Sequence, residues 1–317
     1  MALGTNHITT TSGDVYIPEL WSNEVVAAYK ANLVLANLVT NLNFEGKKGA
    51  IINIPEGTRG SATAKSQEAA VTFITAVETD VNLTIDQHFH YARVFDDLYT
   101  IQALPSLRQF YTDDAGYALA IQVENYLWGR SYALGGGTAG TTVSGVTGDF
   151  GTGAFSGADG TTAFDASADT GIGALTDAAI RRSIQRLDDN NVPLSDRALV
   201  VPPIEKRNLT GLPRFTEQAF VGEAGGANTI RNGLVGDIYG IPVYVSSNCP
   251  TDTDGSVDAR MVLLLHKSAL VLATQMAVRT QTSYELEFLA DVFVADTIFG
   301  AIELRDTSGV KLAVAAS

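Results

Sequence analysis

The most regular alternation of apolar and polar residues in this chain lies between Val81 and Phe95, where apolar residues such as Leu83 and Ile85 occupy most of the alternate positions. Side chains of a strand point alternately to its two faces, so this pattern predicts one β-strand, about 50 Å long at roughly 3.3 Å per residue. Strands of compact domains usually have about 3–10 residues, and a two-stranded ribbon is only marginally stable alone in water. We therefore predict that residues 44–95 form a ribbon that projects from the body and lies on another surface.

Two other stretches have the three- and four-residue apolar spacing of amphipathic helices. The first lies within residues 17–43. The second covers residues 96–131, where Asp96 and Asp97 suit the start of a helix and Pro105 should kink or restart it. From Pro105 onward this helix would be roughly 40 Å long at about 1.5 Å per residue, which is enough to cross a whole domain.

The remaining sequence divides into a glycine-rich stretch and a region of alternating helices and strands. Residues 134–173 contain 12 glycines and no Lys, Arg or Pro, which predicts a loop-rich insertion with one weak hairpin. After it, Thr176 suits the cap of a helix, and apolar strands alternate with helices up to about residue 275. Strand-like runs, including residues 285–289 and 310–314, fill the C-terminal part. The predicted fold class is α+β.

The composition separates this chain from several functional classes. Its 317 residues include 21 Lys and Arg against 35 Asp and Glu, which gives a net charge of −14. A protein that binds nucleic acid electrostatically needs a basic surface, so this balance argues against such a role. Hydrophobic residues make up 45% and charged residues only 18%, so uncharged surface must be covered, and subunit contacts are one way to cover it. No apolar stretch reaches the roughly 18 residues of a membrane span, so no membrane contact is predicted.

No motif in the sequence carries a convincing catalytic, cofactor or metal site. Residues 135–140 match G-x-G-x-x-G, but they follow a predicted helix and so lack the strand-then-helix context of a dinucleotide site. His88 and His90 share one strand face, yet a metal would need a further ligand from elsewhere. Cys249 and His266 could be read as a thiol dyad, but no group can be assigned to orient them. We therefore predict no enzymatic activity and no cofactor.

Three segments and the order of the elements indicate a family. The segments are residues 17–25 (IPELWSNEV) with 37–39 (NLV), residues 94–98 (VFDDL) before the long helix, and residues 236–246 (GDIYGIPVYVS). In these segments, and in its sequence of arm, helix, ribbon, long helix and α/β region, the chain resembles the major capsid protein of tailed bacteriophages, which has the Hong Kong 97 fold. The resemblance covers nearly the whole chain.

The resemblance implies a division of the chain and a function. The segments would be an N-terminal arm (1–16), an N-terminal helix region (17–43), an extended β-hairpin loop (44–95), a spine helix of the peripheral domain (96–133), a Gly/Thr-rich insertion (134–173), an axial domain (174–275) and C-terminal strands that return to the peripheral domain (276–317). The chain would assemble with itself into pentamers and hexamers of an icosahedral shell, in the host cytoplasm, and become part of the virion. Scaffold, portal and decoration proteins are further expected partners, and double-stranded DNA would be enclosed without sequence-specific binding.

Charged residues in the extended loop and on one helix are the candidate subunit contacts. They are Lys47, Lys48, Arg59, Lys65, Glu68, Arg181, Arg182 and Arg186. Two other functions remain open at this point. An encapsulin-like compartment would have the same fold and would enclose a cargo enzyme. An acidic α/β hydrolase would place its site within residues 174–275 and would need Cys249 or His266 for activity.

Overall fold

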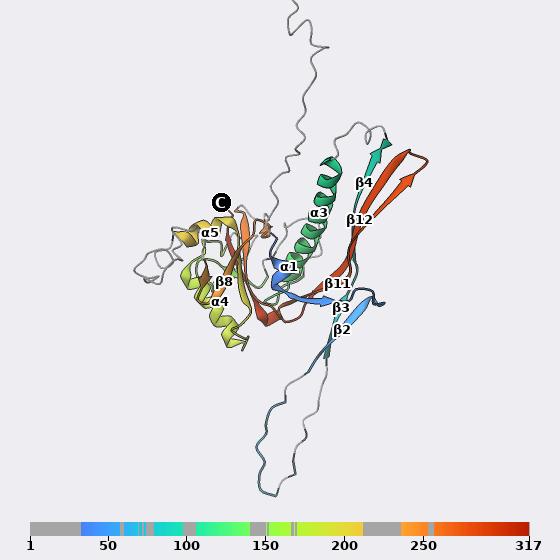
Figure 1. Ribbon diagram of the computed structural model, residues 1–317. Coiled ribbons are helices and arrows are strands. Elements are labelled where there is room, and N and C mark those ends of the chain that lie inside the picture. The colour runs from blue at the N-terminus through green and yellow to red at the C-terminus, as the bar shows by residue number, and fades with distance from the viewer. Residues whose placement is uncertain are drawn as a thin grey trace, which may run out of the picture.

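The computed structural model describes residues 33–57, 60–68, 70–71, 73, 79–97, 106–139, 150, 152–165, 168, 170–211, 236–252 and 257–316. Its α-helices are α1 (Leu35–Leu38), α3 (Ser106–Ser131), α4 (Asp177–Asp189) and α5 (Pro203–Thr210). Its strands are β1 (Thr40–Asn43), β2 (Ile51–Glu56), β3 (Thr79–Thr84), β4 (Gln87–Asp96), β5 (Ala154–Ser156), β6 (Arg197–Val201), β7 (Asp237–Ile238), β8 (Ile241–Val245), β9 (Thr251–Asp252), β10 (Ala259–His266), β11 (Leu270–Glu285), β12 (Ala290–Glu303) and β13 (Gly309–Ala315). These strands form a seven-stranded sheet, a four-stranded sheet and a two-stranded ribbon (Figure 1).

The seven-stranded sheet has the order β5-β13-β10-β6-β8-β7, with β9 paired to β10. Its central strand β10 is almost continuously apolar, because both of its faces are buried. Met261 and Leu263 point toward the hydrophobic core beside the C-terminal part of α3, whereas Val262 and Leu264 point into a second core. Helix α4 covers that second core. Its first turn is capped by Thr176, whose hydroxyl accepts a hydrogen bond from the amide of Ala179 at 3.2 Å, as the sequence predicts.

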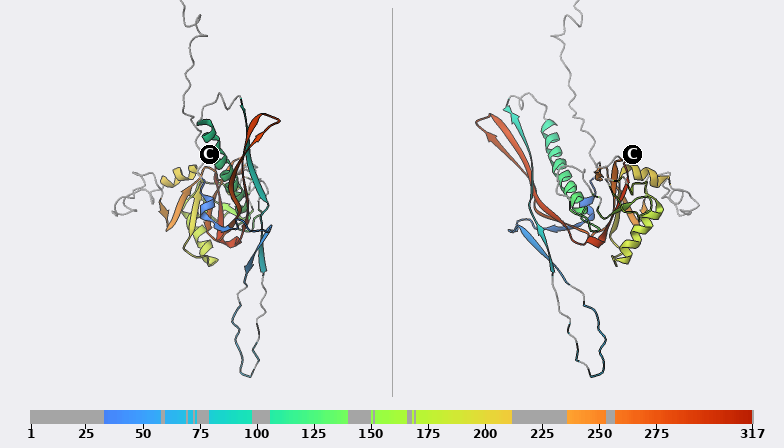
Figure 2. Two further views of the ribbon diagram at one scale, coloured as in Figure 1. Left: turned by 45° about the vertical axis from the view of Figure 1, so that its right-hand side comes forward. Right: turned by 180° about the vertical axis from the view of Figure 1, so that it is seen from behind.

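The four-stranded sheet has the order β1-β11-β12-β4, and its two central strands form one long hairpin. Helix α3 lies along one face of this sheet (Figure 2). Ala115 and Leu119 of α3 are buried against Phe293 and Ala295 of β12, and Phe89 of β4 packs beside them. The long helix is therefore held by its apolar stripe to the sheet, and its C-terminal end reaches the core of the seven-stranded sheet.

Strands β2 and β3 pair with each other alone, and with the residues between them they are called the strap. The strap base lies on the face of the four-stranded sheet opposite α3, where Leu83 and Ile85 are buried against Val271 and Ala273 of β11. Close approach is possible because Gly300 of β12 has no side chain: a Cβ there would lie 2.9 Å from the Cα of Ile85. Beyond the base, the strap extends away from both sheets (Figures 1 and 2).

The prediction that residues 81–95 form a single strand is wrong, because the structure has two strands there. Apolar and polar residues do alternate here, but the strand is interrupted at Ile85 and Asp86, between β3 and β4. Strand β4 pairs with β12 along its whole length and belongs to the four-stranded sheet. The ribbon is therefore limited to β2 and β3, and residues 44–95 are not one projecting unit. The reason is that β3 lies on one face of the four-stranded sheet, whereas β4 is a strand of that sheet. An alternation of apolar and polar residues does not show this change of position.

Two predicted helices also differ from the structure. Within residues 17–43, the described part has only the short helix α1, and β1 follows it and pairs in parallel with β11. The start of that region and the predicted arm at 1–16 lie outside the described residues. Asp96 is the last residue of β4, where its backbone pairs with Ala290, and Asp97 directly after it is helical, so the two residues stand where the strand ends and a helix begins. The described long helix begins at Ser106, directly after Pro105, which fits the predicted restart.

The glycine-rich insertion and the last strand are more integrated than the sequence predicts. Phe150 is buried and stacks on Phe164, with ring centroids 5.2 Å apart, and β5 adds a parallel edge strand to β13. Strand β13 itself pairs with β10. The C-terminal strands at 276–317, predicted to return to the peripheral domain, thus divide between the two sheets: β12 lies against α3, and β13 completes the seven-stranded sheet. Strand β11 also continues across the predicted boundary at residue 275, although its register with β12 shifts between Thr274 and Arg279.

Candidate subunit-contact surfaces

The strap presents an exposed surface far from the molecule's own core. Six residue pairs, from Ile51 with Thr84 to Glu56 with Thr79, join its two strands. The described residues between the strands are all exposed, and Phe73 keeps 91% of its surface accessible. Large apolar side chains that a chain leaves open in this way are typical of surfaces that another molecule covers. The described loop residues of the strap are therefore not buried by their own chain.

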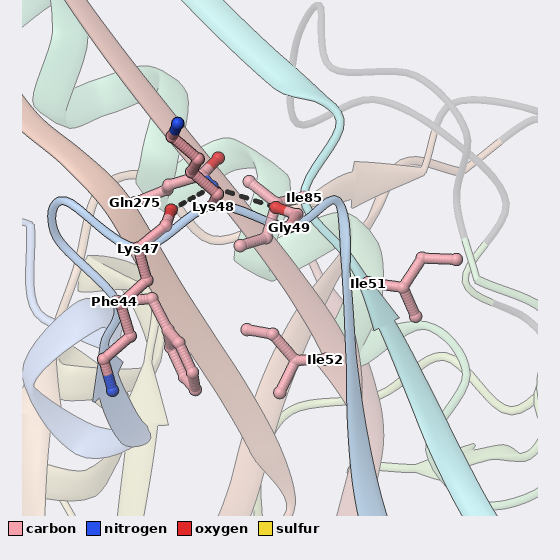
Figure 3. Close-up of a pocket in the computed structure, with 8 residues that line it drawn as sticks. All are labelled: Phe44, Lys47, Lys48, Gly49, Ile51, Ile52, Ile85 and Gln275. Atoms are coloured by element: carbon pink, nitrogen blue, oxygen red, sulfur yellow. Dashed lines mark hydrogen bonds between the residues drawn. The ribbon is translucent and has the colours of Figure 1, made fainter.

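A pocket of about 280 Å³ lies at the strap base (Figure 3). It is lined by Phe44, Lys47, Lys48, Gly49, Ile51, Ile52, Ile85 and Gln275. The turn at Lys47–Gly49 is fixed by Gln275 of β11, whose side-chain amide donates hydrogen bonds to the carbonyl oxygens of Lys47 and Gly49, both at 2.9 Å. The Lys47 ammonium lies 5.0 Å from the centre of the Phe44 ring. The pocket therefore combines an apolar lining with two exposed lysines.

The turn between β11 and β12, residues 286–289, forms a second exposed apolar surface. Leu286, Phe288 and Leu289 expose 79%, 72% and 60% of their surfaces. The turn is held to the end of β4, because the amide of Asp97 donates to the carbonyl of Leu289 and the Tyr284 hydroxyl donates to the Asp97 carboxylate at 2.6 Å. The sequence predicts a strand through residues 285–289, and the turn at these positions shows that this part of the prediction is wrong.

The predicted contact residues fall in two distant places. Lys47 and Lys48 line the strap-base pocket, and Lys65 and Glu68 lie exposed in the strap. Arg59 is outside the described residues. The structure thus brings the two lysines of the turn together with apolar residues that the sequence did not single out.

The three arginines of α4 contact groups of their own chain. Arg181 forms an ion pair with Asp177 at 3.1 Å, and Arg182 donates to the side chain of Gln185. Arg186 lies over the ring of Phe155, and burial together with the charge of Arg182 lowers its pKa. A subunit contact through these arginines stays a prediction, and it would have to replace or share these contacts.

Several ionisable groups in the interior are placed for structure. Glu124 of α3 is buried, and its carboxylate accepts hydrogen bonds from the amides of Val34, Leu35 and Ala36 at 3.0–3.2 Å. Burial raises its pKa, although these three hydrogen bonds act in the opposite direction. The carboxylate therefore fixes the N-terminal segment to the long helix.

A second group of charges lies where β12 leads into β13. The fully buried Lys311 ammonium donates to the carbonyl oxygens of Tyr132 and Thr152 at 2.6 and 2.7 Å. Burial, and then the nearby charge of Asp306, raise the pKa of Glu303 to about 7. These contacts connect the last turn after α3 to the seven-stranded sheet.

The residues considered for catalysis or metal binding do not form such a site. Cys249 is buried, and burial raises its thiol pKa to about 12, so it is not a nucleophile near neutral pH. His266 contacts the Ser268 hydroxyl at 2.8 Å, and burial lowers its pKa. His88 lies 3.2 Å from Asp296, which also receives an ion pair from Arg279.

The described part of the chain also lacks a metal-binding cluster and a membrane-spanning helix. No group of three or more His, Cys, Asp or Glu residues is arranged to hold a metal ion there. Among the described residues, no helix has the length and apolarity needed to cross a membrane.

Comparison with known proteins decides the family. The family model described as "Phage capsid protein" matches residues 92–310, which is more than half of the chain. The chain belongs to this phage capsid protein family. The predicted phage capsid protein with a Hong Kong 97 fold is thereby confirmed, and its role is structural and not enzymatic. An encapsulin-like compartment and a hydrolase are not favoured.

Solved structures show the same fold at low sequence identity. A chain of Mycobacterium phage Che8 is 23% identical with a TM-score of 0.70, covering 94% of this chain and 97% of that chain. A chain from the capsid structure of the Cyanophage P-SCSP1u is 17% identical with a TM-score of 0.71, covering 99% and 97%. A chain from the acidic stable capsid structure of Helicobacter pylori bacteriophage KHP30 is 10% identical with a TM-score of 0.71, covering 99% and 100%. A search of curated protein sequences gives no significant match. The capsid chain is therefore a component of a virion shell built from self-associating subunits.

Proposed function

We propose that this chain forms the pentamers and hexamers of an icosahedral shell that encloses double-stranded DNA. The observation that carries the proposal is the strap, a ribbon whose described loop residues are all exposed on their own chain. A strap that lies across an adjacent copy makes a contact between two different surfaces, and such heterologous contacts generate closed rings when the rotation closes. The net charge of −14 keeps free subunits soluble and favours containment of DNA over binding to it.

In this proposal the two sheets correspond to the two domains of a capsid subunit. The four-stranded sheet with α3 would be the peripheral domain, and α3 its spine helix. The seven-stranded sheet with α4 and α5 would be the axial domain, extended beyond residues 174–275 by β5 and β13. Assembly in the host cytoplasm, with a scaffold, a portal and decoration proteins, completes the proposal.

Shortening the strap tests this function. Because Glu56 and Thr79 are paired, residues 57–78 can be replaced by an Asn-Gly turn without changing β2 or β3. Electron microscopy of the wild-type chain, produced with and without its scaffold, should show closed icosahedral particles. The shortened chain should keep the far-ultraviolet circular dichroism and melting temperature of unassembled wild type and form no closed shell. A wild-type chain that stays monomeric at high concentration would overturn the proposal. Closed shells from the shortened chain would show that assembly does not need the strap.

A further inference from the structure

We propose that the strap-base pocket, defined by Phe44, Lys47, Lys48, Ile52 and Gln275, receives the β11–β12 turn of a second copy of this chain. The inference rests on the proposed shell and adds to it a specific contact between two surfaces. The occupant is residues 285–289 of another subunit, because that segment carries exposed apolar side chains and carboxylates opposite in charge to the lysines of the pocket.

The pocket is suited to an apolar side chain flanked by carboxylates. Phe44, Ile52 and Ile85 are half-buried or buried and provide an apolar lining, and the volume of about 280 Å³ is larger than a phenylalanine side chain. Lys47 and Lys48 are both exposed at its rim, with Glu45 as the acidic residue of the same turn. Figure 3 shows Lys47 alongside Phe44, and Lys48 extending from the turn in another direction. The fixed Lys47–Gly49 turn holds the rim in place before any partner arrives.

The β11–β12 turn carries the complementary features. Leu286 and Phe288 are each more than two-thirds exposed, and Glu285 and Glu287 alternate with them. No Lys or Arg occurs between residues 280 and 297, so the whole end of the hairpin is negatively charged. An apolar tip with carboxylates fits an apolar pocket with ammonium groups, and this complementarity of charge favours one orientation and one partner.

One chain cannot make this contact with itself. Gln275 lines the pocket and belongs to the same strand, β11, that leads to the turn. Ten residues of strand separate Gln275 from Glu285, which is about 30 Å at roughly 3.3 Å per residue. The hairpin tip points away from the strap base (Figures 1 and 2). The occupant must therefore come from another subunit, and the contact joins two different surfaces as a shell requires.

Charge reversal tests the proposed contact. K47E/K48E and E285K/E287K should each raise the protein concentration needed for particle assembly by at least about tenfold. The combined variant should restore assembly to within about threefold of wild type, and K47R/K48R should assemble normally. Circular dichroism and melting of unassembled subunits check that each variant folds. Wild-type particles with no effect of either reversal would overturn the contact alone, whereas absence of wild-type particles would overturn the proposed function.

A cysteine pair tests the same contact by geometry. In K48C/L286C, each subunit should link to two neighbours, so assembled particles oxidised with copper phenanthroline should give a ladder of covalent multimers on non-reducing gels. The buried Cys249 does not compete, because only 1% of its surface is exposed. K48C alone and L286C alone should give no multimers. Closed particles of the pair without a ladder, or dimers from a single variant, would overturn the proposal.

Discussion

Replacing Glu124 by alanine removes one carboxylate that three backbone amides share. The amides of Val34, Leu35 and Ala36 donate to it at 3.0–3.2 Å, and the carboxylate is buried. These contacts connect the start of the described chain to α3, about ninety residues later. The variant should therefore release the N-terminal segment while α3 and both sheets stay folded.

The expected size of the effect follows from these contacts. A hydrogen bond to a charged group contributes about 1.5–3 kcal/mol, but the three bonds share one acceptor and are not additive. Removing the carboxylate also removes the cost of burying its charge, which is the cause of its raised pKa. We expect a net loss of about 3 kcal/mol in the free energy of local opening, which is roughly a 100-fold change in the opening equilibrium. Glu124→Gln keeps one oxygen acceptor, so it should lose about half as much.

Hydrogen exchange measured by mass spectrometry gives the readout. Peptides that contain Leu35 and Ala36 should lose protection roughly 100-fold in Glu124→Ala and tenfold in Glu124→Gln. Asp113→Asn, which changes an exposed acid on the same helix, serves as the control and should leave these peptides unchanged. All chains are compared in the same assembly state. Unchanged protection of these peptides in Glu124→Ala, with α3 still protected, would refute the reasoning.

Three further experiments test other parts of the structure. Because burial and Asp306 raise the pKa of Glu303 to about 7, the folded chain holds a proton that the unfolded chain releases near 4.5. Stability should fall as pH rises through this window, so Glu303→Gln should melt with wild type at pH 5 and above it at pH 8. Gly300→Ala should lower stability by about 1–3 kcal/mol because its Cβ meets strap-base backbone, whereas Gly116→Ala, with open space in α3, should raise it by up to about 1 kcal/mol. Equal melting temperatures of the Gly300→Ala and Gly116→Ala variants would contradict the predicted close contact at Gly300. Cys249 should react with a thiol reagent only in denaturant, since its pKa is about 12 in the folded chain.

Elements whose signals are local could be predicted from the sequence. Helix α4, which begins at the residue after Thr176, could be predicted because all its signals are close in sequence. The cap and the apolar positions Ala179, Ile180 and Leu187 lie within thirteen residues of one another. Strand β10 is recognisable for a similar reason, since a strand buried on both faces needs an apolar residue at nearly every position.

Partners distant in the sequence could not be predicted in the same way. Leu83 and Ile85 face one side of the four-stranded sheet, whereas Phe89 and Tyr91 face α3 on the other side. All four sit at odd positions of one alternation, so the pattern continues while the neighbour of the strand changes. Gly300 of β12 permits this crossing from far along the chain.

Strand β13 contained a signal of its own. Lys311 stands in the middle of an apolar run, and a buried ammonium must find acceptors. Its two acceptors are carbonyl oxygens after α3 and in the glycine-rich insertion, so the charged residue identifies which core the strand completes.

The candidate contact surfaces could likewise be predicted only where the signal is local in the sequence. Lys47 and Lys48 were predicted as subunit contacts because they are charged. A sequence does not show, however, which charged residues already have a partner in their own chain, and Arg186 has one in the ring of Phe155. The apolar turn at residues 286–289 was missed because its residues continue the apolar run of the strand sequence on either side of it. A signal was nevertheless present, since turns usually use Gly, Asn, Asp, Ser or Pro, and none of these occurs there. Leu289 even adopts a φ of 46°, a conformation that glycine would accept more easily. A turn that keeps large apolar side chains against its own conformational preference is placed to bury them in a partner, and the residue types at these four positions are enough to indicate such a surface.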